Sequence, residues 1–257
     1  MLDIPTDTVS LSEQQRLVRD SIRDICADFD ATYWRQRDRN GEYPHEFVAE
    51  LVDGGWFGIR IPQEYGGVGM GTPETVVMFE EIAANGGGFS AAQAVHGGIY
   101  NSRPIVEYGS ETLKAELLPE VAAGETAIQA FGLTEPNAGS DSTAIETLAE
   151  RDGDEYVVSG QKIWTSRVDV SDYLLLMART SARADVEKRT DGISMFLVDI
   201  DAARRAGQLQ METIPKTASE SVHAFELWFD DLRVAERYLV GEEGRGRTDT
   251  DGYNSWA

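Results

Sequence analysis

The hydrophobic pattern of this chain changes its period once, near residue 125, and this change restricts the possible folds more than any other feature of the sequence. Before it, apolar residues recur every three or four positions, as they do along one face of an amphipathic helix. After it, short β-branched and aromatic runs alternate with turn residues, and no helical stretch separates them. The sequence therefore predicts an α+β chain, with an all-helical domain over residues 1–125 and an antiparallel β-barrel or sandwich domain over residues 126–240.

The helical part opens with a helix start signal. Ser12 is a suitable N-cap. A regular apolar stripe follows it at spacings of four, three and four, made of Val18, Ile22, Ile25 and Phe29. A second helix is expected after Pro44, and three more are expected at residues 72–84, 90–108 and 110–123.

A glycine-dense loop at residues 61–71 lies between two of these helices. Its glycines stand at positions 66, 67, 69 and 71. The dinucleotide-binding fingerprint needs glycines at relative positions one, three and six, directly after a strand. We therefore expect a tight backbone turn here and not a phosphate cradle.

The β part contains five candidate strands, at residues 146–151, 156–158, 173–178, 193–199 and 225–229. Asp152-Gly153 is a turn signal between the first two candidate strands, and Ser159-Gly160 is a turn signal after the second. The charged residues 181–191 have no period, so we expect an exposed loop there. Residues 241–257 have neither an apolar period nor β content, and we expect them to form a disordered tail.

Composition excludes several classes of function. The 45 acidic and 23 basic side chains give a formal net charge of -22, which repels phosphate backbones and anionic lipid. A single cysteine, Cys26, allows no internal disulfide, and the N-terminus has no secretory signal. No apolar run reaches membrane-spanning length. The sequence predicts a cytoplasmic protein that binds neither nucleic acid nor membrane.

Catalytic and metal-binding constellations are poorly supported. The histidines His45, His96 and His223 are isolated in the sequence and lack the spacing of metal ligands, so structural roles are expected for them. Cys26 lies in the apolar stripe of the first helix, which favours a packed, inert thiol. We therefore expect no metal site.

Two phrases of the β part favour a planar ligand. Residues 131–141, Phe-Gly-Leu-Thr-Glu-Pro-Asn-Ala-Gly-Ser-Asp, run from a strand into a turn rich in backbone N–H groups and hydroxyls. Residues 160–166, Gly-Gln-Lys-Ile-Trp-Thr-Ser, bring an indole and two hydroxyls to a strand end. Trp164 suits stacking on an aromatic ring, and the hydroxyls suit its heteroatoms. An ordinary turn and a core tryptophan are the alternative interpretations.

Both phrases resemble those of the acyl-CoA dehydrogenases. The family shares a phrase similar to residues 133–141 and a second similar to residues 160–166. It also shares a proline-acidic-tyrosine-glycine-glycine loop similar to residues 62–67, and a late phrase similar to residues 229–244. The order and spacing of all four phrases agree, from residue 11 to about residue 246.

The resemblance implies a helical N-terminal domain, a middle β domain that holds FAD, and a C-terminal four-helix bundle that also builds a homo-oligomer. It implies α,β-dehydrogenation of an acyl-CoA with hydride transfer to flavin N5, followed by reoxidation by an electron-transferring flavoprotein. FAD contacts fall on the matching residues Phe131, Leu133, Thr134, Ser140, Trp164, Thr165 and Ser166. Ser140 also matches a position near the acyl-CoA. Candidates for the acyl pocket are Gln93, His96 and Tyr100.

The match stops where relatives continue into the bundle, because this chain reads Arg247-Thr248-Asp249 after Gly246. In the family the catalytic glutamate lies in that bundle, so no catalytic residue is assigned, and Glu135 is expected to be structural. We expect a truncated form that binds FAD weakly and is inactive by itself. Two alternatives remain open: a flavin monooxygenase or oxidase of the same fold, and a non-catalytic interaction protein derived from it.

Overall fold

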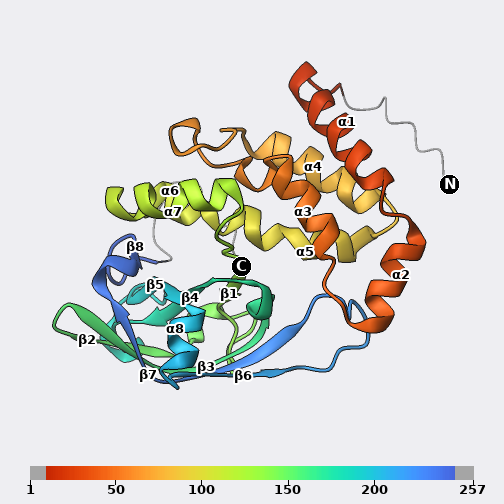
Figure 1. Cartoon of the computed structure of the whole chain (residues 1–257). Coiled ribbons are helices and arrows are strands. Elements are labelled where there is room, and N and C mark those ends of the chain that lie inside the picture. Colours follow the sequence, from red (N-terminus) through yellow and green to blue (C-terminus); the bar gives the residue numbers. More distant parts are fainter. Residues whose placement is uncertain (1–9, 247–257) are drawn as a thin grey trace.

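The computed structural model describes residues 10–246 of the chain, and the predicted α+β organisation is confirmed. Figure 1 shows a helical part stacked on one side of a sheet domain. In the described residues the helical part contains α1 (Glu13–Ala27), α2 (Ala31–Asn40), α3 (His45–Asp53), α4 (Thr72–Ala84), α5 (Gly88–Tyr100), α6 (Ser102–Tyr108) and α7 (Glu111–Ala123).

The first helix starts as predicted. The Ser12 side chain accepts from the Gln15 backbone N–H, and the Gln15 side chain accepts from the Ser12 backbone, which is a capping box. Of the predicted stripe, Val18 and Ile22 are fully buried against the other helices. Burial of this stripe stabilises α1 more than its intrinsic propensity does.

Two features of the helical part differ from the prediction. Helix α2 was not expected, because its sequence is mostly polar and buries only Trp34. Its start is set by Asp30, whose carboxylate accepts from the backbone N–H groups of Thr32 and Tyr33. The single helix expected over residues 90–108 is divided into α5 and α6 at Asn101, whose buried amide donates to the Ile128 carbonyl at 3.0 Å.

The glycine-dense loop is a tight turn, as predicted. Gly66 has φ +82°, and a Cβ on Gly67 would lie 2.1 Å from the Ile61 carbonyl oxygen. Only glycine permits this approach of the two backbone segments.

The sheet domain contains eight strands in the described residues: β1 (Ala130–Gly132), β2 (Leu148–Asp152), β3 (Glu155–Ser166), β4 (Tyr173–Arg179), β5 (Ile193–Asp199), β6 (Leu209–Thr213), β7 (Ala224–Ala235) and β8 (Leu239–Val240). Their order is β6-β7-β3-β2-β4-β5-β8, with β1 paired to β4 beside this path. Most pairs are antiparallel, but β1 and β2 both pair with β4 in parallel, and the sheet is not closed.

Three details of the sheet prediction are wrong. The turn expected at Ser159-Gly160 lies inside β3, where it forms a register shift against β7 instead of ending the strand. A short helix, α8 (Ile200–Arg205), interrupts the strands after β5 and is capped by the Asp199 side chain. Strand β6 was missed because its outward residues are polar and only Leu209 is buried. The charged stretch 181–191 is a largely exposed loop between β4 and β5, as expected.

The helical and sheet domains share a hydrophobic core. Leu113, Leu117 and Leu118 of α7 pack with Leu175 of β4 and Leu197 of β5, and all five are buried. This core crosses the domain boundary, and across the same boundary α5 contacts β1 and α6 contacts β8.

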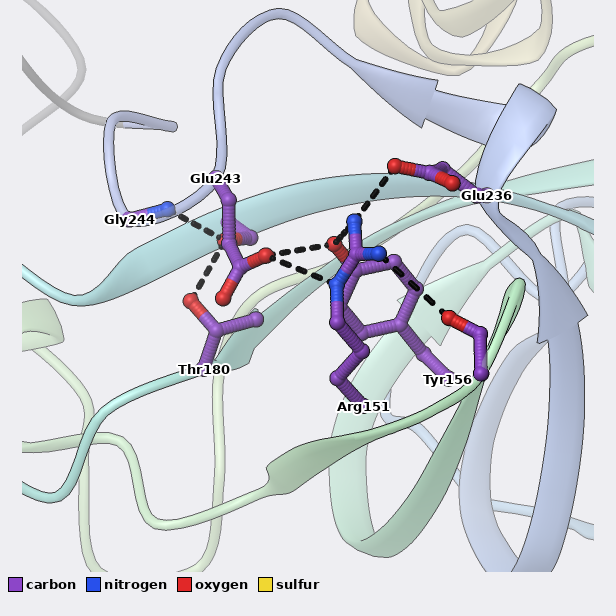
Figure 2. A network of polar contacts seen from close by, with 8 residues as sticks. Arg151, Tyr156, Thr180, Glu236, Glu243 and Gly244 are labelled. Carbon is purple, nitrogen blue, oxygen red and sulfur yellow. Dashed lines mark hydrogen bonds and ion pairs between the residues drawn. The ribbon is translucent and has the colours of Figure 1, made fainter.

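Residues 241–246, which the sequence assigns to a disordered tail, pack against β5 instead. The Gly244 N–H donates to the Ser194 hydroxyl at 2.8 Å, and Glu243 accepts from the Tyr156 hydroxyl at 2.7 Å (Figure 2). Arg151 lies between Glu236 and Glu243 and contacts both carboxylates. The remainder of the predicted tail, residues 247–257, lies outside the described residues. Within residues 10–246, no helix has the length and apolar character needed to cross a membrane.

Candidate functional site

A pocket of about 1020 Å³ lies between the helical domain and the carboxyl ends of β1 and β3. Helix α4 supplies Thr72, Thr75, Val76, Phe79, Glu80 and Ala83, and helix α5 supplies Phe89, Ala92, Gln93, His96 and Tyr100. The sheet side supplies Phe131, Leu133, Thr134, Ile163, Trp164, Ser166 and Arg167. This mainly apolar lining with a few polar groups is typical of a small-molecule site.

The two sequence phrases meet in this pocket. Five of the seven predicted cofactor contacts line it: Phe131, Leu133, Thr134, Trp164 and Ser166. The Ile163 N–H donates to the Thr134 carbonyl at 2.9 Å, so a backbone hydrogen bond joins the phrases. The other two predicted contacts lie elsewhere, because Thr165 is buried behind the pocket wall and Ser140 is exposed beyond the turn.

The end of β3 is bent so that its indole faces the pocket. The pairing of β3 with β7 shifts register between Lys162 and Thr165, and Trp164 has φ 62°. A bulky residue with positive φ is strained, and such strain clusters at binding sites. Trp164 remains 53% exposed although it is a large aromatic residue. Phe89 and Val76, which line the same pocket, are exposed by 73% and 57%.

A buried ion pair, Lys162–Glu135, lies behind the residues that line the sheet side of the pocket. Lys162 and Glu135 have side chains that are 0% and 7% exposed, and Lys162 Nζ lies 2.7 Å from Glu135 Oε1. Lys162 also donates to the Leu133 carbonyl at 3.1 Å, while Glu135 accepts from the backbone N–H groups of Glu146 and Thr147. Burial lowers the pKa of Lys162 to about 8, and Lys162 holds the pKa of Glu135 below its usual value despite burial. Glu135 is therefore structural, as expected.

A second polar cluster closes the α5 end of the pocket. Arg167 is 3% exposed and donates to the carbonyls of Gln93 and Gln129, at 2.5 and 3.3 Å. A Cβ on Gly97 would lie 2.3 Å from the Gln129 carbonyl oxygen and 2.6 Å from Arg167 Nη2. Because Gly97 has no side chain, helix α5 can approach the Gln129 carbonyl and the Arg167 guanidinium this closely.

Three of these α5 residues were predicted to line an acyl pocket, and all three line this pocket: Gln93, His96 and Tyr100. Arg167 and the α4 residues were not predicted. Arg167 follows the second phrase directly, but nothing in its neighbours along the chain indicates that its partners come from α5 and β1.

Two further titratable candidates, Cys26 and His223, lie outside the pocket lining. Cys26 is buried, and burial raises the pKa of its thiol to about 11, so it is a poor nucleophile. His223 Nδ1 lies 2.6 Å from the Asp169 carboxylate, outside the pocket lining. Among residues 10–246, no group of three or more potential ligands is arranged to hold a metal ion.

Comparison with known proteins decides the family. The model of the acyl-CoA dehydrogenase N-terminal domain matches residues 12–125, and that of the acyl-CoA dehydrogenase middle domain matches residues 130–232. The chain belongs to the acyl-CoA dehydrogenase family.

Individual relatives match nearly all of this chain. The mitochondrial isovaleryl-CoA dehydrogenase of Pongo abelii is 30% identical over 247 residues, which are 95% of this chain and 57% of the relative. The structure of a glutaryl-coenzyme A dehydrogenase in complex with glutaryl-CoA superposes with a TM-score of 0.82 at 30% identity, over 93% of this chain and 59% of the other.

A third relative was solved with a reduced flavin. The glutaryl-CoA dehydrogenase of Mycobacterium smegmatis in complex with FADH2 gives a TM-score of 0.77 at 27% identity, over 91% of this chain and 57% of the other. The chain thus spans somewhat less than two thirds of the length of the relatives that it matches.

Proposed function

We propose that this chain forms the flavin-binding part of an FAD-dependent acyl-CoA dehydrogenase, which oxidises an acyl-CoA thioester between its α and β carbons. The observation that carries the proposal is the meeting of Thr134, Trp164 and Ser166 in one pocket, because these residues come from the two phrases that the family shares.

The residues of the pocket fit the isoalloxazine ring of FAD. The exposed indole of Trp164 offers a flat apolar face for stacking. The hydroxyls of Thr134 and Ser166 offer donors and acceptors to the polar edge of the ring. The buried Gln93 Oε1 has no hydrogen-bond partner within the described residues, so an acceptor is left over for a ligand N–H.

When bound, FAD would accept the hydride that leaves the β carbon. The residues of this chain would bind and orient the ring and exclude water from it. Trp164, Phe89 and Val76 would cover its faces, while the ion pair of Lys162 and Glu135 would keep the Leu133 segment in place. Phe131 and Leu133 line the same pocket and are proposed as further FAD contacts. Thr165 and Ser140 lie outside its lining and are proposed from the resemblance alone, Ser140 also as a contact of the acyl-CoA.

The same pocket offers a poor choice of base for the α proton. Among its described lining residues the one carboxylate is that of Glu80, and this side chain is exposed to solvent on α4. We therefore propose that the 257-residue polypeptide binds FAD weakly and does not turn over acyl-CoA by itself. Assembly as a homo-oligomer, reoxidation by an electron-transferring flavoprotein and a cytoplasmic location are proposed from the resemblance to the family.

The test is a titration of the purified chain with FAD, followed by absorbance near 450 nm and by quenching of flavin fluorescence. Trp164→Ala should weaken FAD binding about tenfold, because stacking on an aromatic residue contributes about 1–3 kcal/mol. Leu17→Ala is a matched control, because Leu17 is also an exposed apolar residue, at 63%, but lies outside the pocket. Failure of the unmodified chain to bind FAD, or equal binding by the Trp164 variant, would refute the flavin site.

A second measurement addresses turnover. We expect no steady reduction of a dye by octanoyl-CoA when the FAD-loaded chain is the only protein present. Steady dye reduction would contradict the proposal that this polypeptide is inactive alone, while leaving the flavin site intact.

A further inference from the structure

Arg167 is a buried cation whose hydrogen-bond partners are all neutral. Its Nε–H donates to the Gln129 carbonyl, and Nη1–H donates to the Gln93 carbonyl. Its third contact joins Nη2 and His96 Nε2 at 3.4 Å. Within the part of the chain that the structure describes, Arg167 forms no ion pair with a carboxylate. A buried guanidinium normally has such a partner, because an uncompensated buried charge is costly.

The neighbouring titratable groups do not neutralise this charge. His96 Nδ1 lies 3.1 Å from the Gln93 carbonyl, which accepts, so Nδ1 carries the proton and Nε2 accepts from Arg167. Burial and the nearby Arg167 charge lower the pKa of His96 to about 4, so the imidazole is neutral at physiological pH. Tyr43 and Tyr100 are neutral too, because burial raises the pKa of both hydroxyls.

Two carboxylates lie farther away. Asp169 attracts Arg167 electrostatically, but its own carboxylate contacts His223 Nδ1 at 2.6 Å. Glu80 lines the opposite, α4 side of the pocket and is exposed to solvent. Water screens an exposed charge far more than a buried one. Arg167 is therefore the one residue of the described pocket lining that carries a permanent positive charge, and Asp169 lies outside that lining.

This charge lies in the wall that carries Trp164 and Ser166, and the inference rests on the proposed flavin site. We propose that the Arg167 guanidinium makes the pocket bind the reduced, anionic form of the flavin ring more tightly than the oxidised, neutral form. Arg167 would thus be a positioning residue that acts through its charge. A positive charge near a flavin shifts the reduction potential of the ring.

The balance of the redox step makes this preference measurable. Oxidised FAD takes up two electrons and one proton to give the reduced anion, or two electrons and two protons to give the neutral reduced form. In the proposed reaction the acyl thioester supplies both electrons and one proton as a hydride, so the product is the anion before any second proton is bound. A site that favours the anion makes the reduced form bind more tightly and takes up one proton per two electrons.

The experiment compares the dissociation constants of oxidised and dithionite-reduced FAD for the full chain and three variants, without any acyl-CoA. Arg167→Gln should reduce the preference for the reduced form at least tenfold, which is about 30 mV in the two-electron potential of the bound FAD. Arg167→Lys keeps the charge and should keep the preference. Arg179→Gln is the matched control, because Arg179 is also buried, at 2% exposure, and also donates to backbone carbonyls, but lies outside the pocket lining.

A second readout needs no variant. In the unmodified chain the potential of bound FAD should change by about 30 mV per pH unit between pH 5.5 and 6.5, which is one proton per two electrons. Free FAD in the same buffers serves as the reference for uptake of two protons, at about 59 mV per pH unit. This measurement decides the matter if Arg167→Gln does not fold.

The outcomes are distinguishable. An unchanged preference in a folded Arg167→Gln variant, a loss in Arg179→Gln of the same size, or a slope near that of free FAD would each overturn the role of Arg167 and leave the flavin site standing. Failure of the unmodified chain to bind either redox form would overturn both.

Discussion

Removing one partner of the buried Lys162–Glu135 ion pair should destabilise the chain far more than removing both. Lys162→Met leaves a carboxylate that is 7% exposed with two backbone N–H donors and no cation. Glu135→Gln leaves an ammonium group that is fully buried beside the Leu133 carbonyl. An uncompensated buried charge costs about 3–5 kcal/mol, so each single variant should lose that much free energy of unfolding.

The double variant Lys162→Met with Glu135→Gln contains no buried charge. Its loss should be about 1–2 kcal/mol, because the Leu133 carbonyl and one backbone N–H lose a partner while the desolvation of two ions is relieved. The two single losses sum to about 6–10 kcal/mol, so the double variant should lose about 4–9 kcal/mol less than that sum, which exceeds the roughly 0.5–3 kcal/mol usual for residues in direct contact.

The assay is urea unfolding at pH 7, where the pair is ionised because the pKa of Lys162 is about 8. Arg233→Met is a control, because Arg233 lies 3.0 Å from Glu155 in a pair whose side chains are 51% and 38% exposed. It should cost less than about 1 kcal/mol. The reasoning is refuted if the single variants cost no more than this control, or if the double variant loses the sum of the two single losses.

Three further predictions concern the pocket and the C-terminal segment. The pKa of His96 is about 4 in the folded chain and near 6.5 for an unfolded histidine, so the unfolded state binds more protons between these values and the free energy of unfolding should fall as pH falls from 6.5 to 4. His96→Gln should remove up to about 3 kcal/mol of this pH dependence, measured from urea midpoints at pH 7 and pH 4.5. Gly97→Ala should lower the free energy of unfolding by about 1–3 kcal/mol and weaken FAD binding, because its Cβ would lie 2.3 Å from the Gln129 carbonyl oxygen. Gly139→Ala should be neutral, because its Cβ would meet nothing within 4 Å. Equal melting temperatures for the two variants would contradict this prediction. Ser194→Ala should lower the free energy of unfolding by about 1–3 kcal/mol, because the Gly244 N–H and the Thr180 hydroxyl both lose a buried partner. Arg151→Ala should lower it by less than about 1 kcal/mol, because its ion pairs with Glu236 and Glu243 are exposed. Thermal unfolding that ranks the two variants in the opposite order would contradict this description of the C-terminal segment.

Elements with a strong apolar period were predicted well. Helix α4 and strand β5 match their predicted ranges residue for residue. Helix α4 buries Val77, Met78 and Ile82, and β5 is a short apolar run that is buried on both faces of the sheet. Elements without such a face were missed: α2 depends on the Asp30 cap, and β6 depends on pairing with β7. Local sequence carries little information on an element whose stability comes from a cap or from a neighbouring strand.

The candidate site was predictable only in part. The phrases around Thr134 and Trp164 were recognisable, and they do share a pocket. The positions of Ser140 and Thr165 outside that pocket were not predictable. Thr165 lies beside a register shift of β3, where a change of one residue moves a side chain to the other face, and Ser140 lies in the irregular segment after β1, which has no period.

The order of residues alone determined that helices come first and strands second, and it identified the family through short phrases with fixed spacing. Tertiary structure alone decided that Arg167 lies in the pocket wall without a carboxylate, because its partners Gln93, His96 and Gln129 are between 38 and 74 residues away along the chain. Periodicity records which face of an element is buried, whereas the charge of a cavity depends on which distant side chains the packing brings together.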